Sequence, residues 1–193
     1  MTWLADKLLK LSGWRFSGTL PDLPKLIIIG APHTTNWDFI IYLGALHHYR
    51  MKASFIGKHT LFRWPFGYFF RWLGGIPVDR SKPGGLVQQV VDAVARAERM
   101  ILVMAPEGTR KAAPYWKSGF LQIAAKADIP IVLGYVDFPN RLAGLGPLLI
   151  VDEDATQFMD QARSFYADKQ GLHAEGKGPV RVREEVEPGG EPG

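Results

Sequence analysis

A histidine and a carboxylate, His33 and Asp38, stand five positions apart directly after an apolar run at residues 26–29. A carboxylate beside an imidazole can hold the ring in one tautomer and make it a better proton acceptor. An alcohol or an amine needs such an acceptor when it attacks a carbonyl carbon, so the pair predicts acyl transfer. A second interpretation stays open, in which Asp38 only charges the N-terminus of a helix and His33 is a loop histidine without a partner.

The spacing of the pair restricts the local structure that could join the two side chains. Five residues turn a helix through about 140° and bring a strand to its opposite face, so neither regular element lets the pair meet. We expect instead a strand that ends near Ala31, a turn that carries His33, and a helix that starts around Asn36. Asp38 would then lie in the first helical turn and fold back toward the imidazole.

Two other segments place an arginine after an apolar run, at Arg80 and at Arg110. A guanidinium group binds phosphate or carboxylate through two parallel hydrogen bonds, so two converging arginines would make an anion clamp. Each arginine could equally form a structural ion pair with a nearby carboxylate. Glu107, three positions before Arg110, could orient that arginine or receive a substrate hydroxyl.

The elements that must position these residues alternate along the chain. Apolar patterns predict strands at residues 25–31, 53–56, 76–79, 101–104 and 130–136, with a short apolar run at 148–151, and helices at 36–49, 85–99, 117–126 and 156–169. This order predicts an α/β fold in a single domain, with a mostly parallel central sheet flanked by helices on both faces. Ligands of such sheets bind at the carboxyl ends of the strands, where His33, Arg80 and Arg110 would converge.

The 193 residues divide by pattern into three regions. The domain itself spans residues 21–172, and its length and the chain's apolar fraction of 47% fit one hydrophobic core. Residues 1–20 form an amphipathic N-terminal segment, whose leucines could either lie on a bilayer or pack on the domain. Residues 173–193 are rich in Gly, Pro, Glu and Arg with too little apolar content to bury, so we expect a mobile tail.

Aromatic side chains crowd residues 62–72, with cations at Lys58, Arg63 and Arg71. Rings beside cations suit a membrane interface, where the rings lie among headgroups and the cations meet phosphates. The rings could also line an acyl-chain tunnel, belong to the core, or stack on nucleic acid. The net charge of +4 fits acidic small molecules, anionic lipids and nucleic acid about equally. Because the run is too apolar for a solvated groove and no nucleic-acid motif accompanies it, we favour a lipid surface and expect no nucleic-acid partner.

Several kinds of site are excluded or disfavoured by the composition. The chain has no cysteine, which removes disulfides, thiolate metal ligands and a cysteine nucleophile. No serine stands in a Gly-x-Ser-x-Gly motif, so direct attack by the acceptor is simpler than a covalent enzyme intermediate. No His-Glu-x-x-His or similar spacing occurs, and we expect no metal. No apolar run reaches about 18 residues, so we expect no membrane-spanning helix.

Four sequence blocks resemble the motifs of the glycerolipid acyltransferase family, which includes the lysophosphatidic acid and glycerol-3-phosphate acyltransferases. The blocks are His33-Thr34-Thr35-Asn36-Trp37-Asp38, Gly75-Ile76-Pro77-Val78-Asp79-Arg80, Pro106-Glu107-Gly108-Thr109-Arg110 and Ile129-Pro130-Ile131-Val132. They stand in the family's order between residues 25 and 136, and four ordered blocks are far more specific than one. The chain departs from the family pattern around the acceptor, at Pro32, at Thr35 and at residues 111–116.

The resemblance implies a role for each matched residue. His33 is expected to be the general base, and Asp38 is expected to orient it. Arg80 and Arg110 would hold an anionic group of the acceptor, and Glu107 with its neighbouring glycine would shape the acceptor site. The full set of residues that the resemblance assigns to substrate binding is Arg80, Glu107, Gly108, Thr109 and Arg110.

The resemblance also implies an acyltransferase of phospholipid biosynthesis. The donor would be acyl-CoA or an acyl carrier protein thioester, which acts as a co-substrate, and no cofactor is expected. The acceptor would be the hydroxyl of a lysophospholipid such as lysophosphatidic acid, with the protein peripheral on the inner, cytoplasmic face of a membrane. Two alternatives remain: acyl transfer to an acceptor without phosphate, such as a lyso-ornithine lipid, and a non-catalytic membrane-surface lipid-binding protein.

Overall fold

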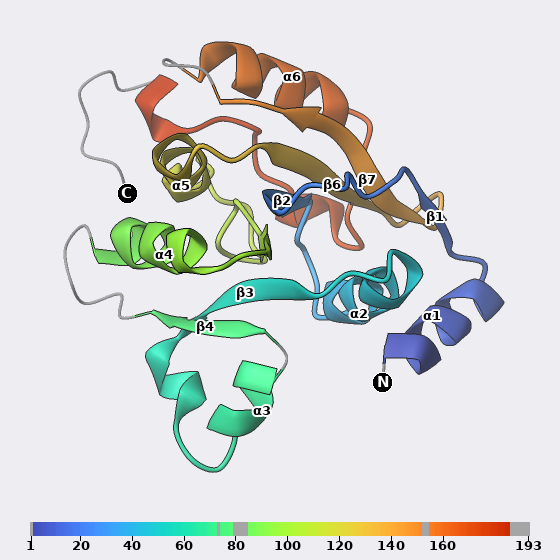
Figure 1. Cartoon of the computed structure of the whole chain (residues 1–193). Helices are drawn as coiled ribbons and strands as arrows, with labels where there is room; N and C mark the ends of the chain where they lie inside the picture. The colour runs from blue at the N-terminus through green and yellow to red at the C-terminus, as the bar shows by residue number, and fades with distance from the viewer. Residues whose placement is uncertain (1, 73, 79–84, 152–154, 186–193) are drawn as a thin grey trace.

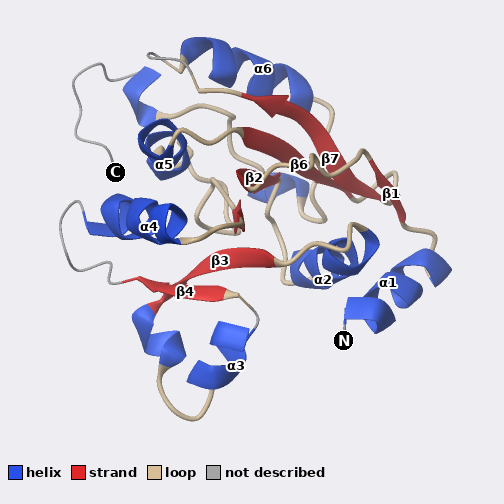
Figure 2. Cartoon of the chain, in the orientation of Figure 1, coloured by secondary structure: helices blue, strands red, loops and turns tan. Residues whose placement is uncertain are grey.

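The computed structural model of the chain describes residues 2–72, 74–78, 85–151 and 155–185. Seven strands in these residues form one sheet, with helices on either side of it (Figure 1, Figure 2). The strands are β1 (Arg15–Ser17), β2 (Lys25–Ala31), β3 (Ala53–Lys58), β4 (Gly75–Val78), β5 (Met100–Met104), β6 (Ile131–Asp137) and β7 (Leu142–Leu149). The helices are α1 (Thr2–Leu11), α2 (Asp38–His48), α3 (Gly67–Trp72), α4 (Gly85–Arg96), α5 (Gly119–Ala127) and α6 (Thr156–Tyr166), with 3-10 turns η1 (His59–Phe62), η2 (Ala174–Gly176) and η3 (Arg183–Glu185).

The sheet is parallel except at one edge. Its strand order is β1-β7-β6-β2-β5-β3-β4, and every neighbouring pair is parallel apart from β6 with β7. The predicted α/β fold with a mostly parallel sheet is therefore confirmed. Strand β2 pairs with β5 so that Ile29 lies opposite Met104, and the segments that follow these two strands emerge at the same edge.

Alternating side chains of β2 explain why helices cover both faces of the sheet. Ile27 and Ile29 belong to a core cluster that includes residues of α4, α5 and α6. Leu26 and Ile28 belong to a second cluster, against which residues of α2 pack. Successive side chains of a strand point to opposite faces, so a strand that is apolar at every position is stable only when it is covered on both.

Strand β7 is visible in the sequence only as a short apolar run. It spans Leu142–Leu149, whereas the apolar pattern stands out only at residues 148–151. Its glycines interrupt the pattern for a steric reason. A side chain at Gly144 would meet the backbone of Ser17 in β1, and one at Gly146 would meet an aromatic ring of α6.

Helix α1 packs on the domain through positions other than the three leucines that form its apolar pattern. Ala5 and Leu9 are buried, while Leu4, Leu8 and Leu11 are exposed. The three leucines therefore do not pack on the domain and face outward instead. None of the helices in the described ranges is long and apolar enough to cross a bilayer.

The C-terminal region differs from the mobile tail that its composition predicts. Residues 173–185 lie against the domain, where Val182 is buried and forms a β-bridge with Trp116. Ser118 Oγ donates a hydrogen bond to Glu184 at 2.6 Å. One buried valine, side-chain hydrogen bonds and backbone contacts hold the region, and a low apolar content does not reveal such contacts. Residues 186–193 of the predicted tail lie outside the described residues.

Candidate active site

The loop between β2 and α2 brings His33 and Asp38 together. His33 Nδ1 lies 2.9 Å from Asp38 Oδ2. The Asp38 side chain is 9% exposed, whereas the imidazole is 34% exposed. The carboxylate is therefore buried behind a ring that remains accessible to a substrate.

The backbone that precedes α2 holds the Asp38 carboxylate in place. Oδ2 accepts the N–H groups of Thr34 at 3.0 Å and Thr35 at 3.1 Å in addition to the imidazole. These bonds explain why α2 begins at Asp38 rather than at Asn36 as predicted, because the preceding residues turn to reach the carboxylate. The positive end of the helix dipole also favours a negative charge at this position. A carboxylate held in this way accepts Nδ1–H of His33, which leaves Nε2 as the proton acceptor of the neutral ring.

Glu107 joins the segment after β5 to the same loop. Its Oε2 accepts the backbone N–H of His33 at 2.6 Å, and the residue is buried with 4% exposure. Burial raises the pKa of the Glu107 carboxyl above its ordinary value of 4.5, and the hydrogen bond from His33 opposes that shift. The sequence left open whether Glu107 orients Arg110 or receives a substrate hydroxyl, and the contact with the backbone of His33 is neither of these roles.

The other predicted substrate-binding residues follow Glu107 along an exposed loop. Gly108, Thr109 and Arg110 are all exposed, and Gly108 has a φ of +66°, which favours glycine. A Cβ at Gly108 would also lie 3.3 Å from Cγ of Lys117. Arg80 lies outside the described residues, so its convergence with Arg110 stays a prediction.

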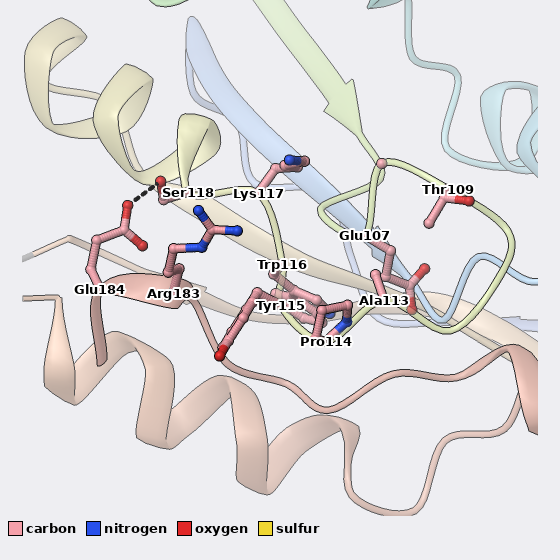
Figure 3. A pocket seen from close by; sticks show the side chains of 11 residues that line it. Glu107, Thr109, Ala113, Pro114, Tyr115, Trp116, Lys117, Ser118, Arg183 and Glu184 are labelled. Carbon is pink, nitrogen blue, oxygen red and sulfur yellow. Dashed lines mark hydrogen bonds between the residues drawn. The ribbon is translucent and has the colours of Figure 1, made fainter. Parts of the chain in front are cut away.

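The loop after β5 borders cavities large enough for polar parts of a substrate. A cavity of about 190 Å³ extends from Glu107 to Lys117 and on to Arg183 of η3 (Figure 3). A further cavity of about 340 Å³ has Arg110 and Lys111 in its lining, together with Thr34 and His173. The second cavity therefore joins the cationic end of this loop to the residue that follows His33.

Two groups that support the site gave no signal in the sequence. Tyr166, at the end of α6, is buried, and its hydroxyl lies 3.0 Å from the carbonyl oxygen of Ile29 and 2.8 Å from that of Gly134. A single tyrosine in an amphipathic helix pattern does not indicate which backbone it will reach. The second group is the C-terminal region, whose His173 donates its N–H to Thr34 Oγ1 at 3.3 Å.

The arrangement can act as a base toward a hydroxyl group placed beside the imidazole. Asp38 fixes the ring from behind, and Glu107 fixes the backbone of His33 from a second loop. No group of three or more His, Cys, Asp or Glu side chains in the described residues is arranged to hold a metal ion. The chemistry available to these residues is proton transfer and the binding of anionic groups.

Comparison with known proteins relates this chain to acyltransferases. The model of the acyltransferase family matches residues 16–133. A curated 1-acyl-sn-glycerol-3-phosphate acyltransferase of Streptococcus pneumoniae is 29% identical over 128 residues, which are 65% of this chain and 47% of that protein. The chain thus spans about half the length of this relative. The crystal structure of the 1-acyl-sn-glycerophosphate (LPA) acyltransferase PlsC from Thermotoga maritima matches with a TM-score of 0.56 and 17% identity, over 83% of this chain and 76% of that one.

The two kinds of likeness support different statements. At 17% identity, the solved structure shows a shared fold. The family model covers more than half of the chain and includes His33, Asp38, Glu107 and Arg110. As the four ordered sequence blocks predicted, this chain belongs to the acyltransferase family.

Proposed function

We propose that the protein transfers a fatty acyl group from a thioester, acyl-CoA or acyl carrier protein, to the hydroxyl of a lysophospholipid such as lysophosphatidic acid. The observation that carries this proposal is the 2.9 Å contact between His33 Nδ1 and Asp38 Oδ2 in a chain of the acyltransferase family. The names of the similar proteins from Streptococcus pneumoniae and Thermotoga maritima, both acyltransferases for an acylated glycerol phosphate, support the choice of acceptor.

In the proposed reaction His33 acts as general base and then as general acid. Nε2 takes the proton of the acceptor hydroxyl while the hydroxyl oxygen bonds to the thioester carbonyl carbon. The carbon–sulfur bond then breaks, and the thiolate leaves with the proton that His33 returns. Asp38 keeps the ring oriented and offsets the charge of the imidazolium. General base catalysis of this kind contributes typically about 10²- to 10⁴-fold, and positioning of the two substrates must supply much of the rest.

We assign the phosphate of the acceptor to the cations that follow Glu107. Arg110 and Lys111 line the cavity that also contains Thr34, next to His33. Neither cation has a carboxylate partner among the described residues. Arg80, if it converges on this loop as predicted, would complete a clamp of guanidinium groups around one phosphate.

We place the reaction at the inner surface of a membrane, because the acceptor and the product are lipids and thioester donors are cytoplasmic. The segment from η1 to α3 exposes Trp64, Tyr68 and Trp72 by 87%, 78% and 75%. Residues 1–78 carry nine Lys or Arg but three Asp and no Glu. Exposed rings beside excess positive charge suit a surface of anionic headgroups.

An acyl transfer assay tests the proposal. Purified protein, oleoyl-CoA and lysophosphatidic acid in mixed vesicles should yield phosphatidic acid by mass spectrometry. His33→Ala should lower the rate by at least about 10²-fold, because it removes the base, and should leave the melting temperature unchanged. The matched control is His47→Ala, in the last turn of α2, which should keep the wild-type rate.

Parallel assays with other substrates distinguish the alternatives. A carrier-protein thioester in place of oleoyl-CoA identifies the donor. Acylation of a lyso-ornithine lipid but not of lysophosphatidic acid would replace the proposed acceptor. Near-normal transfer by His33→Ala would overturn the mechanism, and vesicle binding without transfer to any acceptor would favour a non-catalytic lipid-binding protein.

A further inference from the structure

The last described part of the chain crosses both loops of the candidate site. Residues 170–185, here named the C-terminal strap, leave the end of α6 and finish in η3 beside α5 (Figure 1). They lie beyond the region that the family model matches, residues 16–133. We propose that the C-terminal strap is a positioning element of the active site, which holds the His33 loop against the Glu107 loop. This inference rests on the proposed function.

The C-terminal strap contacts the His33 loop through Thr34. A Cβ at Gly171 would lie 2.6 Å from Thr34 Cγ2 and closer still to its Oγ1, and a Cβ at Gly176 would lie 3.2 Å from the same Cγ2. His173 donates its N–H to Thr34 Oγ1. Thr34 is buried, and its own N–H bonds to the Asp38 carboxylate. A displacement of Thr34 would therefore move the carboxylate that orients the base.

The same strap contacts the loop that follows Glu107. The N–H of Trp116 donates to the carbonyl of Arg181 at 2.8 Å. Ser118 Oγ donates to Glu184, a bond that Figure 3 shows as a dashed line. A Cβ at Gly176 would lie 3.0 Å from the carbonyl oxygen of this loop's arginine, residue 110. Gly176 thus lies between the two loops, and a larger residue there would push on both.

The strap is itself anchored to the sheet through α6. Lys177 Nζ donates to the carbonyl oxygens of Tyr166 and Lys169, each at 2.7 Å, at the end of that helix. The hydroxyl of Tyr166 in turn lies within hydrogen-bonding distance of Ile29 in β2. The strap, the helix and the strand that leads to His33 are therefore connected by hydrogen bonds, so the strap can act as a fixed support.

A support of this kind should determine the turnover number rather than substrate affinity. A displacement of a catalytic group by about 1 Å costs on the order of 10²-fold in rate. Residues of the strap near Thr34 touch the loop and not the reacting atoms. Substitutions there should therefore lower kcat while the KM for the thioester donor stays nearly constant.

Gly171→Ala is the first test. The new methyl group has to displace Thr34, so we expect kcat to fall at least about tenfold, a tenth of the loss per ångström given above, with an unchanged donor KM. The backbone N–H groups of Thr34 and Thr35 should exchange with solvent faster, because their bonds to Asp38 loosen. The matched control Gly119→Ala, where a Cβ has nothing within 4 Å, should leave both readouts unchanged.

A double variant separates positioning from general destabilisation. Thr34→Ala removes the two nearest of the three atoms that a methyl at position 171 would meet, leaves the Cβ at 3.0 Å, and keeps the N–H that bonds Asp38. Adding Gly171→Ala to Thr34→Ala should therefore cost much less kcat than adding it to the wild type. If Gly171→Ala does not fold, Gly176→Ala, where the contacts are longer, takes its place.

Unchanged kcat and unchanged exchange in folded Gly171→Ala and Gly176→Ala would overturn the inference, as would a loss that Thr34→Ala fails to relieve. The proposed function is tested separately by His33→Ala. If the wild-type protein transferred no acyl group, the exchange of Thr34 and Thr35 would still decide whether the strap positions the loop.

Discussion

A single carboxylate oxygen connects three parts of the site. Asp38 Oδ2 receives the imidazole of His33 and the N–H groups of Thr34 and Thr35. The same atom therefore orients the imidazole and shapes the loop that carries it. The negative charge beside His33 and the shape of the loop both depend on the Asp38 side chain, so a substitution that keeps its shape but removes its charge separates the two effects.

Asp38→Asn should lower kcat by about 10²-fold or more, because an amide oxygen carries no charge to offset the imidazolium that forms during transfer. Steady-state kinetics with a thermal melt would check this. Asp128→Asn is the matched control: Asp128 is exposed at the end of α5 with a φ of +51°, a conformation that asparagine also adopts. Equal kcat values for Asp38→Asn and wild type would show that the carboxylate does not assist the base.

Glu107→Gln should change how the free energy of unfolding depends on pH. Burial raises the pKa of Glu107 in the folded state above its ordinary value of 4.5, so the folded protein binds more protons than the unfolded one in that window. The contribution of Glu107 to stability is therefore present at low pH and is lost as pH rises through the raised pKa. Glutamine does not ionise, so the variant should gain stability relative to wild type as pH rises above 4.5.

Urea denaturation of both proteins across that pH range measures the difference. A constant difference would mean that Glu107 titrates alike in the folded and unfolded states. The glutamine can still accept the N–H of His33, so the loop contact is retained in the comparison.

Between elements, the pairing of β2 with β5 places the His33 loop and the Glu107 loop at one edge of the sheet, and α6 is attached to two of the strands. Tyr166 forms the link, since its buried hydroxyl lies near carbonyl oxygens of both β2 and β6. Burial also raises the pKa of this phenol well above its ordinary value, so it stays protonated and able to donate. The helix is thus fixed to two strands by one side chain.

Tyr166→Phe should lower the free energy of unfolding by roughly 1–3 kcal/mol, the cost of leaving a buried carbonyl oxygen without its donor. Tyr68→Phe, at an exposed position on α3, should change it by less than about 0.5 kcal/mol. Urea titration of the two variants beside wild type gives the comparison. Equal stability of the two variants would show that the hydroxyl of Tyr166 contributes nothing to the attachment of α6.

For the whole molecule, charge and exposed apolar side chains are unevenly distributed along the chain. The first 78 residues carry nine Lys or Arg and three acidic residues, whereas the remaining residues carry 14 Lys or Arg and 16 acidic residues, so the excess positive charge lies in the first part of the chain. That part includes both α1 and α3, which lie along the lower side of the molecule in the view of Figure 1. Lys7 lies over the exposed ring of Trp3, a pairing that suits an interface. This distribution favours one orientation of the molecule on an anionic surface.

Replacing Trp64 and Trp72 together with serine should weaken binding to vesicles that contain an anionic phospholipid. We expect roughly a tenfold loss or more, since burying one large ring contributes on the order of 1–2 kcal/mol. The matched control is Ile150→Ser, 77% exposed and just past the end of β7, which should bind as wild type does. Vesicle sedimentation measures the difference, and equal binding of all three proteins would exclude this segment from the membrane contact.

The sequence by itself determined the main alternation of strands and helices and the mostly parallel sheet, and it offered the closeness of His33 to Asp38 as one of two interpretations. These features are local, or they follow from periodic apolar patterns that a chain shows before it folds. A strand, a turn and a helix in succession are enough to fold an aspartate back onto a histidine five positions away. The four blocks that resemble the acyltransferase family were also visible in the sequence alone.

Only the tertiary structure decided which distant groups complete the site. Glu107 reaches the backbone of His33 across 74 positions, and His173 reaches Thr34 across 139. The C-terminal region, with few apolar residues, still packs on the domain through Val182 and its backbone. Contacts of this kind depend on how strands and loops approach in three dimensions, and no periodic pattern along the chain encodes them.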